Sequence, residues 1–166
     1  MTYLRRNEEF GAESDTKIAI MREFKNSEAN HLGIPLPKGR VRFYKQDDDG
    51  QLEFTGENII DHTPKDETLK IYTGNAFDLA GERRRTLFKV ENSEHWCEES
   101  FEIKVRNHKA EPVEIRIVEH LYRGANWDIT EKSDTFLKTN AQEMEFRVQL
   151  KPDEEKVVTY KVHYSW

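Results

Sequence analysis

Residues 31–64, HLGIPLPKGRVRFYKQDDDGQLEFTGENIIDHTP, decide the fold, because they combine three of the chain's five prolines with a turn between two alternating segments. Pro35 and Pro37 hold the backbone close to an extended conformation, since proline fixes φ and also restricts the residue before it. A helix is therefore excluded at the start of this stretch, and the chain enters the following segment as an extended strand.

The two alternating segments of this stretch predict a β-hairpin over residues 40–55. Along residues 40–44, two apolar side chains alternate with polar ones and with a tyrosine, as the two faces of a strand require. The acidic run that ends at Gly50 closes with Asp-Gly, which tolerates the positive φ of a tight turn. Residues 51–55 alternate again, and we expect Gly56 to end this second strand.

The rest of the chain repeats the alternating pattern, which predicts an all-β protein of about ten strands. Short strands separated by turn signals are typical of an antiparallel β-sandwich, and we expect an immunoglobulin-like fold or an elaboration of it. Leu69 and Ile71 should face inward. Residues 101–106 and 113–117 have a turn between them, and we expect them to pair as a hairpin. Further strands are expected at residues 17–24, 68–73, 83–90, 144–150 and 157–166.

The length of 166 residues suits one domain. Residues 1–14 are polar and poorly patterned, which indicates a flexible arm or residual linker, and residues 15–166 then form a single β-sandwich domain. The alternative is a pair of small β domains divided near residues 92–97.

Composition narrows the function classes. The net charge of −6 with 35% charged residues argues against a nucleic-acid-binding protein. The single cysteine, Cys97, cannot form an intrachain disulfide, and we expect it to pack as a small apolar residue. No apolar run is long enough for a membrane span, and residues 1–10 lack the apolar core of a signal peptide.

One group of side chains has the chemistry of a metal or acid–base site. Asp61 and His62 are followed closely by Asp66 and Glu67, and Asp78 comes next along the chain. Histidine and carboxylates together can hold a divalent metal or move protons. The alternative, which we favour, is that these side chains bond the backbone of an irregular loop.

Two other residues are candidates for a binding site. Glu119 interrupts an apolar stripe, so it should be a buried carboxylate that needs a cationic partner, either Arg123 or an arginine from another strand. A structural ion pair is favoured over a pocket. Trp127 belongs to a set of aromatic residues that suits either a glycan- or peptide-binding surface or a β-sheet core; the others are Trp96, Tyr122 and Trp166.

Several multi-residue blocks in one order resemble the bacterial domain of unknown function 4139, the C-terminal domain of mucoidy-inhibitor-A-like proteins. The blocks are residues 24–28 (FKNSE), 32–42 (LGIPLPKGRVR), 61–64 (DHTP) and 74–79 (GNAFDL). The resemblance runs from about residue 17 to residue 166. It implies an all-β domain at the C-terminal end of a longer bacterial protein of the envelope or periplasm, and it implies no catalytic residue.

These observations favour a non-catalytic structural or protein-interaction domain over an enzyme. A protein partner or self-association is expected, without nucleic acid, metal or cofactor, and the sequence leaves a small-molecule ligand open. A glycan- or peptide-binding module is one alternative. A metal-dependent hydrolase that uses the Asp61–His62 region is the other.

Overall fold

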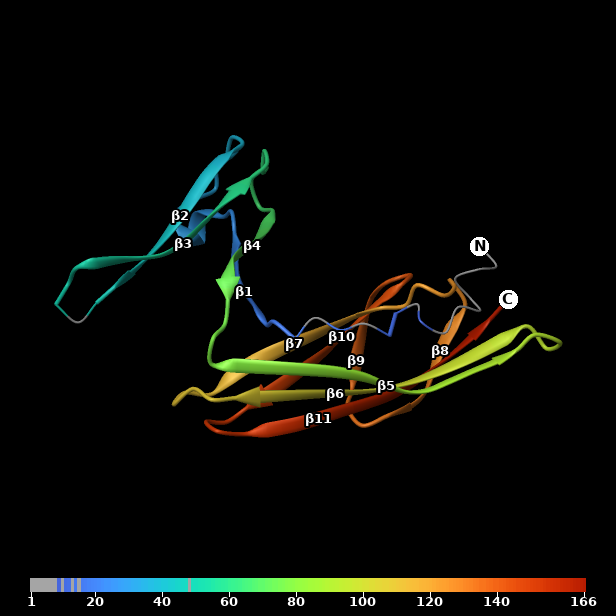
Figure 1. Cartoon of the computed structure of the whole chain (residues 1–166). Coiled ribbons are helices and arrows are strands. Elements are labelled where there is room, and N and C mark those ends of the chain that lie inside the picture. The colour runs from blue at the N-terminus through green and yellow to red at the C-terminus, as the bar shows by residue number, and fades with distance from the viewer. Residues whose placement is uncertain (1–8, 10, 13, 15, 48) are drawn as a thin grey trace. The chain divides into compact units, whose positions relative to one another are not determined.

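The computed structural model describes residues 9, 11, 12, 14, 16–47 and 49–166, and over these residues the chain is all-β (Figure 1). Its eleven strands pair antiparallel in four small sheets, and the helical structure in the described residues is one 3-10 turn, Glu28–Asn30. The predicted all-β antiparallel architecture is confirmed, with eleven strands where about ten were expected. The strands are β1 (Ala19–Lys25), β2 (Gly39–Gln46), β3 (Leu52–Ile60), β4 (Thr68–Asn75), β5 (Leu79–Glu91), β6 (Trp96–Asn107), β7 (Val113–His120), β8 (Trp127–Lys132), β9 (Phe136–Asn140), β10 (Glu143–Leu150) and β11 (Glu155–Ser165).

The chain forms two compact units. The smaller unit is Ile18–Ala76 and holds β1 to β4; the larger unit is Phe77–Trp166, joined by the residues up to Lys17. Most of the arm predicted over residues 1–14 lies outside the described residues. The division into domains, whether one domain or two, stays a prediction.

The hairpin predicted over residues 40–55 is confirmed as β2 and β3, and its turn is closed by a bond from the Gly50 amide to the Asp47 carbonyl, 2.9 Å. The expectation that Gly56 ends the second strand was wrong, because β3 continues to Ile60. Gly56 has φ +153°, and a Cβ there would lie 2.9 Å from the carbonyl oxygen of Thr73 in β4. The glycine is therefore a point of close approach between neighbouring strands.

The interior of the smaller unit lies between its two strand pairs. β1 pairs with β4, and the inward-facing positions predicted for Leu69 and Ile71 are confirmed by their burial. The rings of Phe24 in β1 and Phe43 in β2 meet edge to face with centroids 6.3 Å apart. The side chain of Asn58 in β3 donates to a carbonyl of β4, which links the two sheets.

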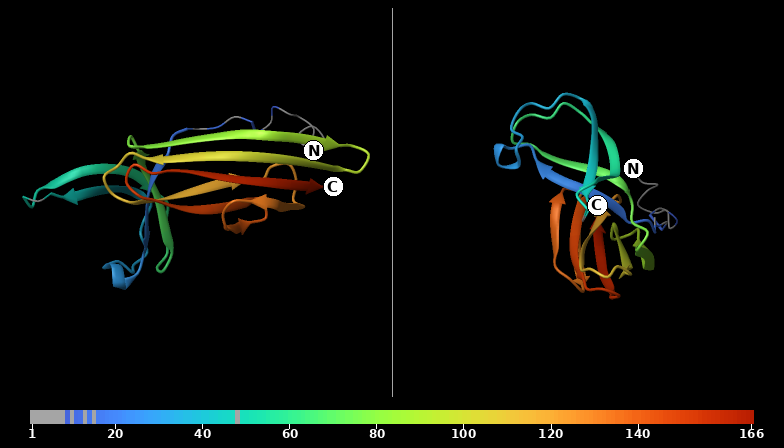
Figure 2. Two further views of the ribbon diagram at one scale, coloured as in Figure 1. Left: turned by 90° about the horizontal axis from the view of Figure 1, so that it is seen from below. Right: turned by 90° about the vertical axis from the view of Figure 1, so that its left-hand side faces the viewer.

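In the larger unit, one sheet has the order β5-β6-β11-β8 and the other β7-β10-β9. Figure 2 shows β5, β6 and β11 side by side. The expected hairpin between residues 101–106 and 113–117 was wrong, because these strands, β6 and β7, belong to different sheets. Both edges of β6 are already occupied, by β5 and by β11, so the chain crosses to the other sheet before β7 begins. Alternation predicts that a segment is a strand but does not name its partner.

Alternate residues of β6, β7, β10 and β11 are buried and form the core of the larger unit. The rings of Phe146 in β10 and Tyr160 in β11 have centroids 5.8 Å apart, so side chains of the two sheets meet. Cys97 is fully buried, as expected of a small core residue. The buried apolar residues of this unit are Cys97, Phe101, Ile103, Val105, Ile115, Ile117, Leu121, Trp127, Met144, Phe146, Val148, Leu150, Val158, Tyr160, Val162 and Tyr164.

Candidate functional site

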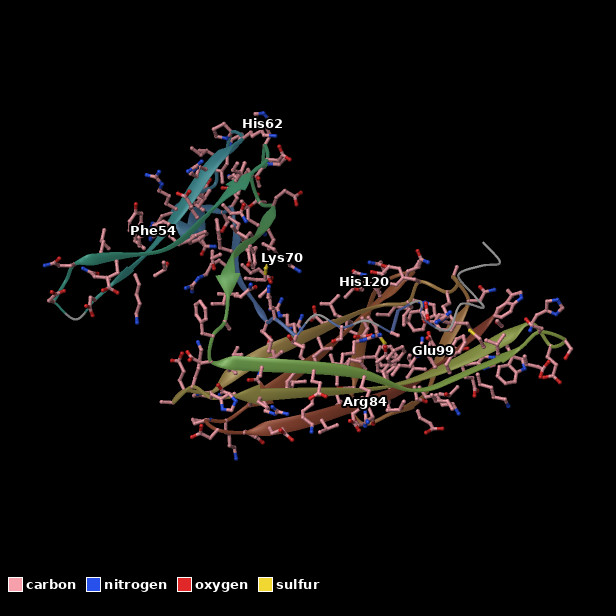
Figure 3. The ribbon with its side chains drawn as sticks, viewed as in Figure 1. Phe54, His62, Lys70, Arg84, Glu99 and His120 are labelled. Carbon is pink, nitrogen blue, oxygen red and sulfur yellow. The ribbon has the colours of Figure 1, made fainter. Side chains whose placement is uncertain are left out.

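The Asp61–His62 loop lies on the surface, and its side chains contact neighbouring loop residues. The carboxylate of Asp61 lies 3.1 Å from the ammonium group of Lys38. Nδ1 of His62 accepts a bond from the backbone amide of Lys38, 3.3 Å. His62 is labelled at the end of the β2–β3 hairpin that is opposite to its turn (Figure 3). These contacts join the loop to the segment that precedes β2.

The remaining members of the predicted metal cluster do not gather around His62. Asp66 and Glu67 are exposed, and their backbone groups pair with the backbone of Asn26. Asp78 belongs to the larger unit, where its carbonyl accepts the amide of His108. Among the described residues, no three His, Cys, Asp or Glu side chains stand close enough together to hold a metal ion.

Asn26 organises this loop region, and sequence reasoning missed its role. Its side chain is fully buried, and Nδ2 donates to the carbonyls of Ile34 (2.7 Å) and Pro64 (2.8 Å). Its Oδ1 accepts the amide of Gly33, 3.0 Å. Backbone carbonyls in irregular segments have no strand partner to donate hydrogen bonds to them. The buried side-chain amide of Asn26 supplies these hydrogen bonds instead. The feature of the sequence that could have indicated this role is an asparagine between a predicted strand and a proline-rich stretch.

Glu119 is the buried carboxylate that its position in the stripe predicted, with 5% of its surface exposed. Arg83 of β5 holds both carboxylate oxygens, with Nε and Nη2 at 2.9–3.0 Å. The hydroxyl of Tyr160 in β11 donates to the same carboxylate. The expected cationic partner was either Arg123 or an arginine from another strand, and the structure shows the latter. The two groups meet in the bidentate geometry that gives the strongest charge-assisted hydrogen bonds.

A second buried carboxylate, Glu99 of β6, is shared by two arginines. Nη1 of Arg85 lies 3.1 Å from one oxygen of Glu99, and the guanidinium of Arg123 reaches both oxygens at 2.8 Å. The Phe88 ring lies next to both guanidinium groups, 4.9 Å from that of Arg85 and 4.5 Å from that of Arg123. We call Arg83, Arg85, Glu99, Glu119, Arg123 and Tyr160 the internal ion cluster.

Two members of the internal ion cluster, Tyr160 and Arg83, have raised pKa values. Burial, followed by the charge of Glu119, raises the pKa of Tyr160 well above its usual value. Burial acts to lower the pKa of Arg83, but the hydrogen bonds and charge of Glu119 outweigh it and raise that pKa. A general base must be able to accept a proton from a substrate. A carboxylate saturated by an arginine fork and a tyrosine hydroxyl is instead suited to holding strands together.

The side chain of Trp127 is part of the core of the larger unit. It is buried, its Nε1 donates to the carbonyl of Ala141 at 2.8 Å, and the ammonium of Lys138 lies 4.1 Å from its ring centre. Trp96 is half-buried, with the ring of His163 at 5.5 Å and the ammonium of Lys89 at 4.9 Å. The tryptophan predicted as a binding residue thus serves the core.

Among the described residues, the most exposed group of large apolar side chains lies on one face of the β2–β3 hairpin. Four residues carry it: Tyr44 is 50% exposed, Leu52 68%, Phe54 56% and Ile59 63%. The rings of Tyr44 and Phe54 meet edge to face at 5.8 Å. On the same face, the guanidinium groups of Arg40 and Arg42 bind one carboxylate, that of Glu57, at 2.6 and 3.0 Å. We call this set the hairpin face.

A β-bulge creates the hairpin face, and the sequence pattern alone does not reveal it. Phe43 is opposite Gly56, whereas the next residue, Tyr44, is opposite Phe54, so Thr55 is an extra residue in β3. An extra residue reverses the faces of every side chain beyond it. Phe54 and Leu52 therefore share the outward face of Tyr44 and lie away from Phe43, which packs on Phe24.

Among the described residues, no helix combines the length and the apolar character that crossing a membrane requires. Comparison of the chain with protein-family models, with curated proteins and with solved structures found no match in any of the three.

Proposed function

We propose that this chain is a non-catalytic β domain whose task is to bind another protein chain, and that the hairpin face is its working surface. The observation that carries the proposal is the exposure of four large apolar side chains on one face of a two-stranded ribbon. A two-stranded hairpin is at best marginally stable in water without further packing. Phe54 lies in the half of the hairpin nearer its turn, away from β4 (Figure 3).

The composition of the hairpin face suits a protein interface. Tyr44, Leu52 and Phe54 are neighbours on this face, and Ile59 lies on the same face beyond the Arg42–Glu57 pair. Large exposed apolar groups on a protein surface often have a binding role. Tyrosine and arginine are the residues most enriched at the energetic centres of protein interfaces. Here a tyrosine, a phenylalanine and two arginines are neighbours on one strand pair.

The larger unit serves in this proposal as a rigid β-sandwich scaffold. The proposal is supported by the alternate buried residues of its two sheets and by the bonds of the internal ion cluster that join β5, β7 and β11. A buried ion pair of this kind contributes little net stability, but it fixes which strands face each other. An immunoglobulin-like arrangement remains the finer part of the proposal.

The resemblance to the bacterial domain of unknown function 4139 supports a place for the chain at the C-terminal end of an envelope or periplasmic protein. The loop that joins three of the resembling blocks is tied by Asn26, whose bonds reach residues of the other two. Those blocks therefore support a structural reading of the resemblance, in which the shared residues build the smaller unit.

Photo-crosslinking at the hairpin face tests the proposal. We would place p-benzoyl-phenylalanine at position 54 of the full chain in living bacterial cells, and in a matched control at position 137, where Leu137 of β9 is equally exposed. We expect a protein adduct from position 54 only, and loss of that adduct when Leu52 is changed to serine. The adduct counts as support once mass spectrometry identifies its protein and the purified protein binds the wild-type chain but not Leu52→Ser.

Equal labelling from both positions, or no protein adduct from position 54, would contradict the proposal. Either outcome would mean that the hairpin face is an ordinary solvated surface.

A further inference from the structure

Among the described residues, strand β2 has a strand partner on one edge only, and that partner is β3. In an antiparallel pair, every second residue directs its backbone amide and carbonyl away from the partner strand. The other edge of β2, over residues 39–46, therefore offers a row of backbone donors and acceptors. An extended segment of another chain can bind such a row by strand addition.

The side chains along this edge are basic. Residues 38–45, KGRVRFYK, include four cations and no acidic residue, although the chain has a net charge of −6. Arg40 and Arg42 share the single carboxylate of Glu57, which leaves a charge of +1, and their side chains are 55% and 56% exposed. Two guanidinium groups have more N–H donors than one carboxylate can accept, so these arginines can bind a further carboxylate.

The inner face of β2, which faces away from the hairpin face, is apolar. Val41 and Phe43 lie on it and are half-buried. Of the buried apolar residues in the described part of the chain, only Leu69 and Ile71 belong to the smaller unit. A further strand with apolar residues opposite Val41 and Phe43 would therefore enlarge a small core.

We propose that the free edge of β2 binds an extended segment of a different protein, in which acidic residues alternate with large apolar ones. This proposal rests on the proposed function, because it names the chemistry of the partner of the same hairpin. When the segment adds antiparallel to β2, its carboxylates lie opposite Arg40 and Arg42, and apolar side chains lie opposite the half-buried residues between them. An aromatic residue opposite Tyr44 extends the Tyr44–Phe54 ring pair of the hairpin face by one strand.

The same cations exclude other extended partners. Charged side chains on an edge strand usually oppose the addition of an ordinary strand. A lysine-rich segment would place like charges side by side, and a second copy of β2 would bring two arginine pairs together. The cations therefore select an acidic segment by repelling the alternatives, which is how specific interfaces commonly discriminate between partners.

Amide NMR spectra of the full chain test the proposal, with synthetic peptides as probes. The first probe is a capped peptide that contains the run Glu-Phe-Val-Glu-Val-Glu, the order that antiparallel addition to residues 40–45 requires. The second has lysine in place of every glutamate. The third keeps the side chains of the first but has backbone N-methyl groups on a neighbouring valine and glutamate, so it loses one donor on each edge.

We expect the glutamate peptide to shift the amide signals of β2 and to slow hydrogen exchange at alternate residues of that strand. The lysine and N-methyl peptides should bind at least tenfold more weakly. In the protein, Arg40→Gln with Arg42→Gln should weaken binding of the glutamate peptide at least tenfold. The matched control is Arg84→Gln in β5, which removes another exposed, glutamate-paired arginine and should leave binding unchanged.

The peptide comparison keeps the test decisive if the double variant does not fold, because it uses the wild-type chain. No shift in β2 at about 1 mM glutamate peptide would overturn the proposal, as would equally tight binding of the lysine or N-methyl peptide. Failure of the peptides, together with an identified protein adduct at position 54, would overturn this inference and leave the proposed function standing. Absence of that adduct would instead contradict the proposed function.

Discussion

Removal of Glu119 should destabilise the larger unit more than any surface substitution. In Glu119→Leu, the guanidinium of Arg83 and the hydroxyl of Tyr160 keep their buried positions without the carboxylate that binds both. Breaking a buried ion pair by removing one partner costs about 3–5 kcal/mol. The side chain of Arg83 is one-fifth exposed and also donates to the carbonyl of Gly11, so we expect a loss of about 3 kcal/mol.

The double variant Arg83→Met with Glu119→Leu should regain part of this loss, because two apolar side chains of similar size replace the ion pair while the buried hydroxyl of Tyr160 still lacks its acceptor. We expect the double variant to lie about 1–2 kcal/mol below wild type. The matched control is Glu102→Leu, which breaks the outer-face pair with Arg84 and should change stability by less than about 1 kcal/mol.

Urea unfolding followed by tryptophan fluorescence is the assay. All three tryptophans belong to the larger unit, so the signal reports that unit alone. With a urea dependence of about 2 kcal/mol per M, the midpoint of Glu119→Leu should fall by about 1.5 M. The reasoning is refuted if Glu119→Leu costs less than about 1 kcal/mol, or if the double variant is no more stable than Glu119→Leu.

Four other predictions follow from the contacts described above. Asn26→Ala should leave the Ile34 and Pro64 carbonyls without their donor, and hydrogen exchange should become faster in residues 26–37 and 61–67 but not in the larger unit. Gly56→Ala should lower the melting temperature of the smaller unit, seen in the near-ultraviolet signal of its tyrosines, because a Cβ meets the Thr73 carbonyl at 2.9 Å. Gly50→Ala should cost less, because a Cβ there meets only the flexible side chain of Gln46, at 3.9 Å. Burial raises the pKa of Tyr160, so the folded state keeps a proton that the unfolded state loses above about pH 10, and stability should fall by about 1.4 kcal/mol per pH unit there. Tyr160→Phe should remove this part of the slope in alkaline urea titrations and leave the part that the buried Tyr164, whose pKa is also raised by burial, contributes; an unchanged slope would refute the assignment. Calcium, zinc, magnesium or manganese, added singly after chelation, should leave the melting temperature unchanged, whereas a clear rise with one metal would favour the hydrolase alternative.

The strands of this protein could be predicted from the sequence because their alternation is regular. In the last strand, β11, buried positions such as Tyr160 and Tyr164 alternate with more accessible ones. The residues that face the core can therefore be identified from the sequence pattern alone. The burial of Glu119 and its need for a cationic partner could be predicted for the same reason, since a carboxylate at an inward-facing position needs a cation.

The pairing of strands and the outward hairpin face could not be predicted. The hairpin expected between β6 and β7 failed because pairing depends on which edges are already occupied, and β11, which takes one edge of β6, comes some fifty residues later in the chain. Leu52 and Phe54 had the pattern of inward residues, and the single bulge at Thr55 turned them outward. The role of Asn26 depends on carbonyls up to 38 residues away, which no local pattern encodes.

Hydroxyl-radical footprinting in living cells tests the central claim most directly, because it measures whether the hairpin face is covered where the protein works. Oxidation of Tyr44, Leu52 and Phe54 in cells would be compared with that of the purified chain at low concentration, with Tyr122 of the larger unit as an exposed reference. We expect the three hairpin residues to be protected several-fold in cells while Tyr122 is oxidised equally in both samples. Equal oxidation of the hairpin residues in both samples would contradict the claim that this face binds another chain.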